Sequence, residues 1–175
     1  MVFISGVHGV GKSHFCKRVQ SELGIATFSA SQLISEQKKQ QMPKDKLIPD
    51  IIDNQKFLIQ ALENLNSKVA NYLLDGHLCL LNENGDVTRI GLDTFLTIQP
   101  TAMVLLTESS EIIAERRIQR DGTLQDIVLI DTFQKEEILY AQEISETLSI
   151  PLKISTGTTD IDNTLDFINS FVGGQ

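Results

Sequence analysis

One run near the start of the chain carries the clearest chemical signal. The segment Gly6–Ser13, with the sequence GVHGVGKS, matches the pattern G-x-x-x-x-G-K-[ST] at every fixed position. In such a run the glycines let backbone N–H groups turn inward around phosphate oxygens, the lysine reaches the terminal phosphates, and the serine hydroxyl holds Mg²⁺. The run therefore predicts a loop that binds the polyphosphate of a nucleotide.

The segments on either side of this loop support the prediction. Val2–Ser5 is apolar and β-prone, and Lys12–Leu23 carries Phe15 and Val19 at helical spacing. A helix that begins at the loop presents unpaired N–H groups and the positive end of its dipole to an anion. We expect the nucleotide to be bound by Gly6, His8, Gly9, Val10, Gly11, Lys12, Ser13 and His14.

A carboxylate forms the second feature with chemical meaning. Asp75 follows the apolar run 70–74, which reads as a buried strand. An aspartate at the carboxyl end of a core strand, beside a phosphate loop, is typical of a Walker B acid that holds Mg²⁺ directly or through water. An aspartate also begins turns, so this assignment depends on the loop. We expect ATP and Mg²⁺ as cofactors, with Ser13 and Asp75 binding the metal.

Arginines follow the fourth core strand. Arg116 and Arg120 are four residues apart and share one face of the predicted helix. Their guanidinium forks suit phosphate contact and charge neutralisation during phosphoryl transfer, whereas a solvated helix end that complements the dipole is the structural alternative. Both interpretations stay open at this point. With Lys12 and Asp75, they are the expected catalytic residues.

Other polar residues allow two interpretations each. His77 is either a base or phosphate ligand beside Asp75 or a hydrogen-bonded structural histidine. Asn54 and Gln55 lie near the start of a predicted helix, where amides could bind an acceptor, although capping explains Asn54 without any function. His8 is expected to shape the loop and not to act in catalysis, because phosphoryl transfer depends mainly on positioning and charge.

Strands and helices alternate along the chain. This alternation predicts a parallel sheet covered by helices on both faces, with ligands at the carboxyl ends of the strands. The pair Asn84-Gly85 predicts an additional hairpin within residues 78–90. The expected core strands are residues 2–5, 25–28, 69–74, 102–106 and 151–154. The expected helices are 12–23 with Gly24 ending it, 29–40, one from Asp50 or Asp53 to about 65, one from Asp93 to before Pro100, one from Ser109 or Ser110 to 120, one from Gln125 or Asp131 to 148, and 160–171.

Composition sets limits on the class of protein. The 175 residues are 41% hydrophobic, which is ordinary for one globular domain. A net charge of −8 argues against broad electrostatic attachment to nucleic acid or to an anionic membrane. No apolar run approaches the ~20 residues of a membrane span, and the residues before the first strand are not expected to act as a cleavable leader. We expect a cytoplasmic protein in which Cys16 and Cys79 are reduced thiols.

In its order of motifs the chain resembles the nucleoside monophosphate kinases among the P-loop proteins, and most of all the compact archaeal-type adenylate kinases. The resemblance covers essentially the whole chain. It is carried by Gly6–Ser13, Asp75-Gly76-His77, Pro100 before the strand to Leu106, and Ile113-x-x-Arg116-Arg117 leading into Arg120-Asp121.

The resemblance implies a three-layer α/β P-loop NTPase fold. Its five-stranded parallel sheet would have the order 2-3-1-4-5 and would form a single domain over residues 1–175. It also implies an acceptor-binding helical region at about 29–69, a lid at about 116–135, and Thr156 and Gly157 near the adenine of ATP.

The chain departs from the family at two places. Residues 31–36 contain no arginine for an acceptor phosphate, although Lys38 and Lys39 follow, and no Lys or Arg lies between Asp121 and Gln134 in the expected lid. These gaps argue against AMP as the acceptor and against a full lid, and a different acceptor or slow hydrolysis fits them at least as well.

Three functions are compatible with these features. The first is transfer of the γ-phosphoryl group of ATP to a small acceptor, a nucleotide or nucleoside. The second is a regulatory or assembly ATPase with a protein or ribonucleoprotein partner. The third, a polynucleotide end kinase, is disfavoured by the acidic balance and by Ser29-Ala30-Ser31 where an aspartate base would stand.

Overall fold

A five-stranded parallel sheet forms the centre of the molecule. The computed structural model describes residues 1–41, 51–82, 84–122 and 124–172. The strands are β1 (Val2–Ser5), β2 (Ala26–Ser29), β3 (Tyr72–Asp75), β6 (Ala102–Thr107) and β7 (Leu152–Thr156). Their order is β2-β3-β1-β6-β7. Because a separate hairpin takes the numbers 4 and 5, this is the predicted order 2-3-1-4-5 of the core strands, and the predicted fold class is confirmed.

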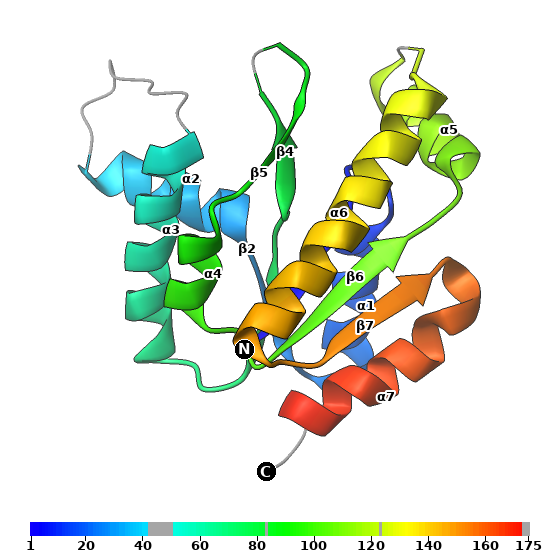
Figure 1. The fold of residues 1–175 in the computed structure, drawn as a ribbon. Coiled ribbons are helices and arrows are strands. Elements are labelled where there is room, and N and C mark those ends of the chain that lie inside the picture. The colour runs from blue at the N-terminus through cyan, green and yellow to red at the C-terminus, as the bar shows by residue number, and fades with distance from the viewer. Residues whose placement is uncertain (42–50, 83, 123, 173–175) are drawn as a thin grey trace.

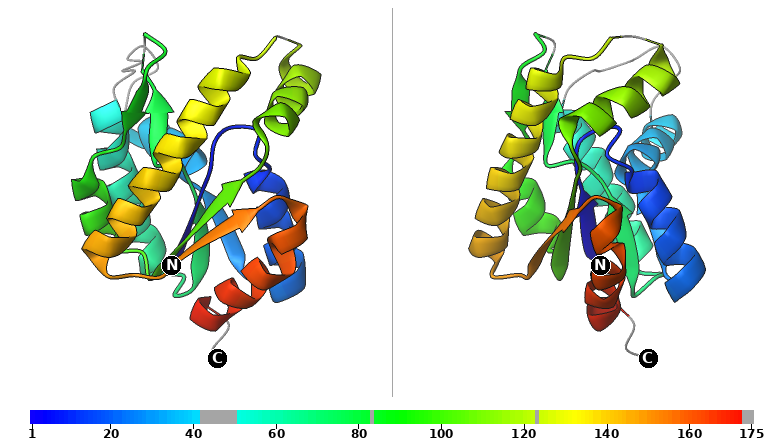
Figure 2. Two further views of the ribbon diagram at one scale, coloured as in Figure 1. Left: turned by 45° about the vertical axis from the view of Figure 1, so that its right-hand side comes forward. Right: turned by 90° about the vertical axis from the view of Figure 1, so that its right-hand side faces the viewer.

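Helices cover both faces of the sheet, as Figures 1 and 2 show. One face is covered by α1 (Lys12–Leu23) and α7 (Ile161–Val172), which follows the short 3₁₀ helix Thr158–Asp160. The other face is covered by α6 (Ile127–Leu148), against which α5 (Ser110–Asp121) packs. Beside β2 a group of three further helices packs together: α2 (Ala30–Gln41), α3 (Ile51–Asn66) and α4 (Leu92–Ile98).

Burial explains the continuous apolar runs of the central strands. All four residues of β1 are buried, and it pairs in parallel with β3 on one side and β6 on the other. A strand covered on both faces reads as an unbroken hydrophobic run, without alternation. The register sets Ile4 opposite Asp75, so the chain leaves β1 and β3 at the same level. The phosphate loop and Asp75 are therefore brought to one edge of the sheet.

Most element boundaries follow the sequence pattern, and the exceptions have local causes. Gly24 ends α1 in the left-handed conformation, and Ser109 caps α5 by accepting a hydrogen bond from the backbone N–H of Ile112. The third core strand begins at Tyr72 and not at residue 69, because the N–H groups of residues 68 and 69 both donate to the carbonyl of Leu65 at 2.9 Å. These bonds extend the turn after α3 and delay the strand.

Three predicted helix starts need correction or fall outside the structure. Helix α4 begins at Leu92, after Gly91, so Asp93 lies within its first turn and does not cap it. Helix α6 begins at Ile127, after the cap Asp126, whose carboxylate accepts hydrogen bonds from two backbone N–H groups at 2.9 and 3.1 Å. Neither Gln125 nor Asp131 has that role. Asp53 lies inside α3, and the alternative cap Asp50 lies outside the described residues.

The predicted hairpin is present. Strands β4 (Cys79–Leu81) and β5 (Val87–Arg89) pair antiparallel, and the turn is closed by Asn82 Oδ1, which accepts from two backbone N–H groups at 2.9 Å. Arg89 joins the hairpin to α6 through ion pairs of 2.6 Å to both Glu136 and Glu143. The hairpin thus stands between the α2–α3–α4 group and the α5–α6 pair (Figure 1).

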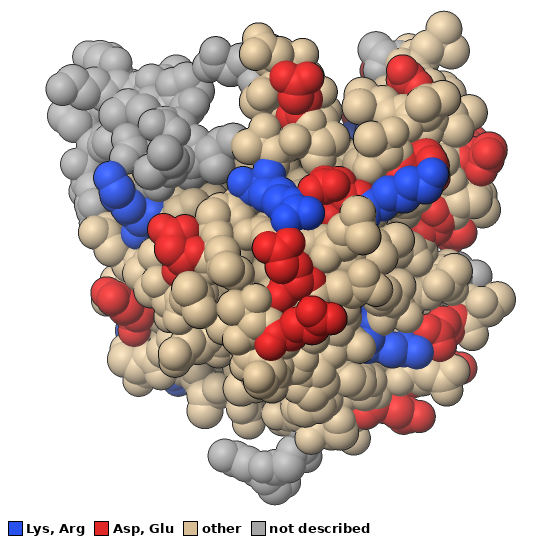
Figure 3. Space-filling model, in the orientation of Figure 1, with Lys and Arg blue, Asp and Glu red and all other residues tan. Residues whose placement is uncertain are grey.

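Charged side chains of both signs are interspersed over the face of the molecule in Figure 3. In the parts of the chain that the structure describes, no helix combines the length and the apolar character that a membrane crossing requires.

Candidate functional site

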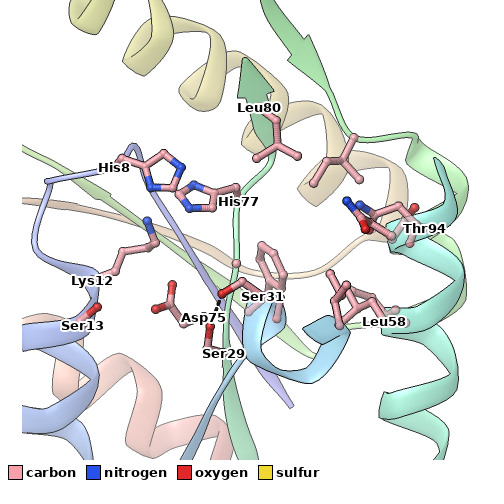
Figure 4. A pocket seen from close by; sticks show the side chains of 18 of the residues that line it. His8, Lys12, Ser13, Ser29, Ser31, Leu58, Asp75, His77, Leu80 and Thr94 are labelled. Carbon is pink, nitrogen blue, oxygen red and sulfur yellow. Dashed lines mark hydrogen bonds between the residues drawn. The ribbon is translucent and has the colours of Figure 1, made fainter. Parts of the chain in front are cut away.

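A cavity of about 530 Å³ opens at the carboxyl edge of the sheet. Its walls come from the phosphate loop, the segment after β3, the start of α2, helices α3 and α4, and the hairpin (Figure 4). Of the site residues predicted from the sequence, it is lined by His8, Gly9, Gly11, Lys12, Ser13, His14, Asp75 and Arg120. The other predicted residues, Gly6, Val10, Arg116, Thr156 and Gly157, lie outside this lining.

The phosphate loop has free donors for an anion. Gly11 precedes α1, which has no side-chain cap and no acidic residue in its first turn, so its first N–H groups remain available to an anion. The Lys12 side chain is buried, and its ammonium donates to the carbonyl of Gly6 at 2.6 Å, across the loop. A cationic group over a ring of amide donors fits the polyphosphate of ATP.

The two arginines after Glu115 hold the loop from the side of α5. Arg117 Nε donates to the carbonyl of His8, and Arg116 Nη1 donates to the carbonyl of Val10, each at 2.8 Å. Gly9 has φ +84°, and a Cβ there would lie 2.9 Å from the Cγ of Arg117. The loop therefore needs glycine at this position both for its backbone conformation and for space.

The arginines do not all face the cavity. Arg116 was expected to meet phosphate, yet its guanidinium contacts the loop backbone and lies 3.4 Å from Glu108. Arg120 lines the cavity and forms an ion pair with Asp121 at 2.6 Å. The i, i+4 spacing drew attention to Arg116 and Arg120 and passed over Arg117, which points from another side of the helix toward the loop. The hydrogen bond from Arg117 to the carbonyl of His8 shows that this arginine also contacts the loop.

Ser13 and Asp75 fit a magnesium site. Both line the cavity, and in Figure 4 they lie on the same side of it as Lys12. Within the described residues no cluster of three or more carboxylate, histidine or cysteine side chains could hold a metal by itself. Mg²⁺ suits such a site, because it uses one or two protein ligands together with waters and substrate phosphates. The hydroxyl of Ser13 and the carboxylate of Asp75 would supply that share.

Burial acts on the charges of this site. It raises the pKa of Asp75 and lowers the pKa of Lys12, while the attraction between these two opposite charges opposes both shifts. A bound cation would further favour the ionised carboxylate, and bound phosphate would favour the ammonium. Binding of both ions would therefore reduce the cost of burying these two charged side chains.

Two histidine rings face each other above Lys12. The ring centroids of His8 and His77 are 4.1 Å apart, at an angle of 44°. Burial, together with the nearby Lys12 charge, lowers the pKa of His8 to about 4 and that of His77 to about 2. Both rings are therefore neutral near pH 7. His77 Nδ1 is buried without a hydrogen-bond partner.

Glu137, on α6, lies beneath the site, and sequence reasoning missed it. Its carboxylate accepts hydrogen bonds from the Ser5 hydroxyl at 2.5 Å and from the N–H groups of Leu78 and Cys79 at 3.0 and 2.9 Å. It joins the end of β1, where the phosphate loop begins, to the segment that follows His77. A single glutamate in a long helix gives no sequence signal, because most such residues are solvated.

The far end of the cavity is mostly apolar. Its polar side chains, Asn54, Gln55 and Thr94, are uncharged. Ser29 and Ser31, whose hydroxyl oxygens are 2.9 Å apart, lie beside Asp75 (Figure 4). Its apolar wall consists of Phe3, Ile34, Leu58, Leu80, Ile90, Phe95 and Ile98. The oxygens Asn54 Oδ1 and Gln55 Oε1 are buried and lack a hydrogen-bond partner. This end lies in the helical region predicted to bind an acceptor.

Solved structures share this fold over nearly the whole chain. An uncharacterized protein from Eubacterium ventriosum is 14% identical with a TM-score of 0.54, covering 99% of this chain and 98% of that one. A gluconokinase from Sinorhizobium meliloti is 17% identical with a TM-score of 0.52, covering 97% and 89%. A sugar kinase from a Janibacter species is 14% identical with a TM-score of 0.54, covering 97% and 92%. At such identities the likeness concerns the fold alone.

Sequence comparison adds one assignment. No curated protein matches the chain significantly. The model of the AAA domain family AAA_17 matches residues 5–134, from the end of β1 into α6, and so includes the phosphate loop, Asp75 and the α5 arginines. The chain therefore belongs to the AAA_17 family of AAA domains.

Proposed function

We propose that the protein is an ATP-dependent phosphotransferase that moves the γ-phosphoryl group of ATP to a small acceptor, a nucleotide or nucleoside, in the manner of the adenylate kinases. The observation that carries this proposal is the cavity itself. One end is built from the phosphate loop and Asp75, and the other from uncharged polar and apolar side chains of α2, α3, α4 and the hairpin. A nucleotide hydrolase needs room for water only, whereas a phosphotransferase needs a second compartment.

In this proposal different residues bind the phosphates, bind the metal and support the loop. The loop N–H groups and Lys12 bind and neutralise the phosphates, and Arg120 lies at the cavity to contact them. Mg²⁺ held by Ser13 and Asp75 supplies charge neutralisation on the phosphates. Arg116 and Arg117 keep the loop in its binding shape through the carbonyls of Val10 and His8. Positioning and charge are the main sources of catalysis in this class of reaction.

The comparisons support the phosphotransferase class, not the acceptor. The gluconokinase and the sugar kinase are kinases with the same fold, but their identity of 14 to 17% supports no transfer of their acceptors to this chain. In the proposal Thr156 and Gly157, at the end of β7, lie near the adenine.

A regulatory or assembly ATPase is the second candidate, and one observation favours it. Leu124, which precedes α6, and Val128, in its first turn, are 94% and 74% exposed. The surrounding region, from 122 to 133, contains no Lys or Arg. Exposed apolar side chains on a segment without basic residues suit a protein partner better than they suit a phosphate clamp.

An acceptor-dependence assay separates the two functions. The protein is incubated with ATP labelled at the γ-phosphate and with Mg²⁺, in the presence and absence of a panel of nucleosides and nucleotides. The phosphotransferase proposal expects the label to appear in one of the acceptors, with ADP release that depends on that acceptor. Release of labelled inorganic phosphate at the same rate with and without every acceptor would reject it and favour the ATPase.

A further inference from the structure

Three buried side-chain atoms in the described part of the chain have no hydrogen-bond partner, and all three belong to residues that line the same cavity. They are Asn54 Oδ1, Gln55 Oε1 and His77 Nδ1. Buried polar atoms are almost always paired in folded proteins, and leaving one unpaired is costly. The first two are carboxamide oxygens, so they accept hydrogen bonds. A ligand in this cavity is therefore expected to donate hydrogen bonds to these oxygens.

His77 presents an acceptor as well. A neutral imidazole carries a proton on one ring nitrogen and a lone pair on the other. We assign the lone pair to Nδ1, which is buried without a hydrogen-bond partner, and the proton to Nε2. In Figure 4 the ring lies between Lys12 on one side and Leu58 and Thr94 on the other. It therefore stands where the two ends of the cavity meet.

The charges of the cavity are distributed unequally. Among its lining residues the permanent cations are Lys12 and Arg120, which come from the phosphate loop and α5. Around Asn54 and Gln55 the described lining is uncharged. An acceptor phosphate at this end would lose its hydration without gaining an arginine or lysine partner from the described lining, which is strongly unfavourable. This end suits a neutral molecule.

The apolar wall adds a shape requirement. Phe3 and Phe95 meet edge to face, with ring centroids 5.6 Å apart, and Leu58 lies on the same side of the cavity as Thr94 (Figure 4). Such a wall buries a flat apolar ring, while the orphan oxygens bind groups at its edge. A nucleoside combines a flat ring with several hydroxyl and amine donors.

We propose that the acceptor is an uncharged alcohol with several hydrogen-bond donors and one apolar face, a nucleoside in preference to a nucleotide, whose reacting hydroxyl donates to His77 Nδ1 while its other donors meet Asn54 and Gln55. This rests on the proposed phosphotransferase function. The hydroxyl oxygen forms a bond to the γ-phosphorus as the bond from that phosphorus to the β–γ bridging oxygen breaks. ADP leaves with the electron pair, and as the new bond to phosphorus forms the hydroxyl proton leaves its hydrogen bond to His77 Nδ1, passes to a phosphoryl oxygen and then to solvent. His77 orients the hydroxyl in this step.

The first experiment compares acceptor classes. Labelled ATP and Mg²⁺ are given with nucleosides, with neutral hexoses and glycerol, and with nucleoside monophosphates, each separately. Labelled nucleoside is expected. Label in the hexoses or glycerol would support a neutral alcohol acceptor that is a polyol or sugar and not a nucleoside. Transfer to monophosphates alone would overturn this inference and leave the phosphotransferase standing, and the absence of transfer to every acceptor would overturn both.

The second experiment removes an orphan oxygen without changing the size of the side chain. Gln55→Met is expected to raise the KM of the alcohol acceptor about tenfold, with the KM of ATP and kcat little changed, since one hydrogen bond is lost from the acceptor alone. Glu63→Gln, at an exposed position of α3, is the matched control and should leave all three values unchanged.

Stability separates a ligand contact from a structural role. Because Gln55 Oε1 has no partner in the protein, Gln55→Met should unfold at an equal or higher urea concentration than the wild type. An unchanged KM for the acceptor in this variant, or a lower unfolding midpoint, would overturn the assignment of Gln55 to the ligand.

Discussion

The hydroxyl of Ser5 donates a hydrogen bond of 2.5 Å to the carboxylate of Glu137, which is 132 residues further along the chain. Ser5 is the last residue of β1, and the phosphate loop starts directly after it. The same carboxylate accepts from the N–H groups that follow His77. One buried group in α6 therefore supports both segments that carry the chemistry of the site.

The first prediction concerns the pH dependence that Glu137 brings. Burial raises the pKa of this carboxyl above its usual value of 4.5, so the folded protein holds the proton more tightly than the unfolded chain. Its contribution to stability is thus full below pH 4.5 and is lost as the pH rises through the raised pKa. Glu137→Gln cannot titrate, so it should gain stability relative to the wild type as the pH increases. Urea unfolding of both proteins from pH 4 upward measures this difference.

The control for that experiment is Glu146→Gln, at an exposed position of the same helix. Its difference from the wild type should show a much smaller change with pH. A constant difference between Glu137→Gln and the wild type across the range would contradict the prediction, as would a difference that grows in the opposite sense.

The second prediction is the loss of nucleotide binding in Lys12→Ala. The Lys12 ammonium is the buried cation of the loop, and no other lysine lines the cavity in the described residues. Without it the phosphates lose their charge-assisted partner, and turnover should disappear. Calorimetry with ATP and Mg²⁺ measures binding, and ADP release measures turnover. Lys17→Ala, at an exposed position of α1, is the control and should behave as the wild type. Equal turnover by Lys12→Ala and the wild type would contradict the proposed function.

The third prediction compares two glycines of positive φ. Gly9 and Gly24 have φ of +84° and +67°, but only Gly9 has a neighbour in the way, Arg117 Cγ at 2.9 Å from an added Cβ. Both Gly→Ala variants should lose about 1 kcal/mol through backbone strain. Gly9→Ala should in addition displace Arg117 from the loop and weaken ATP binding at least tenfold, roughly the worth of one charge-assisted hydrogen bond.

Thermal unfolding and ATP titration of the two glycine variants provide the measurements. Gly24→Ala should keep the affinity of the wild type for ATP, because nothing lies within 4 Å of its added Cβ. Equal affinities of the two variants would show that the contact between Arg117 and the loop has no part in nucleotide binding.

The fourth prediction concerns the hairpin that forms one wall of the cavity. Arg89 lies 4.6 Å above the ring of Tyr140 and pairs with Glu136 and Glu143. In Arg89→Met these contacts are lost, so the backbone amides of β4 and β5 should exchange hydrogen faster while the global stability changes little. Hydrogen exchange read by mass spectrometry localises the effect. Arg18→Met, another arginine with two ion pairs, is the control and should leave the hairpin unchanged.

The local elements of the fold could be predicted well from the residues. The helix Lys12–Leu23 and its terminal Gly24 have the bounds expected, as does the hairpin around Asn84-Gly85. The third core strand was placed too early, because Val69 is β-prone yet its N–H is taken by the helix that precedes it. The β-propensity of a residue does not indicate whether its N–H will pair with a strand or with the end of the preceding helix. The start of this strand therefore could not be predicted from propensity.

The candidate site was foreseen in part. The sequence predicts the loop, Asp75 and Arg120 as site residues, and Asp75, Arg120 and most of the loop line one cavity at the carboxyl edge of the parallel sheet. Arg116 was expected to reach toward phosphate and instead bonds the carbonyl of Val10. The contacts of Arg117 and Glu137 cannot be predicted from the sequence, since their partners are 109 and 132 residues away. The motif that contains Arg117 names no partner for it, and no pattern marks Glu137.

The order of residues along the chain was enough to identify a phosphate loop, a parallel α/β sheet and the edge at which ligands bind, because hydrogen-bond periodicity and glycine conformation act between near neighbours. The folded chain was needed to reveal which arginines hold the loop, which carboxylate supports it, and that three buried polar atoms without a partner belong to residues that line one cavity. Those features depend on the packing of α3, α5 and α6 around the sheet, and contacts between distant segments arise only when the whole core has formed.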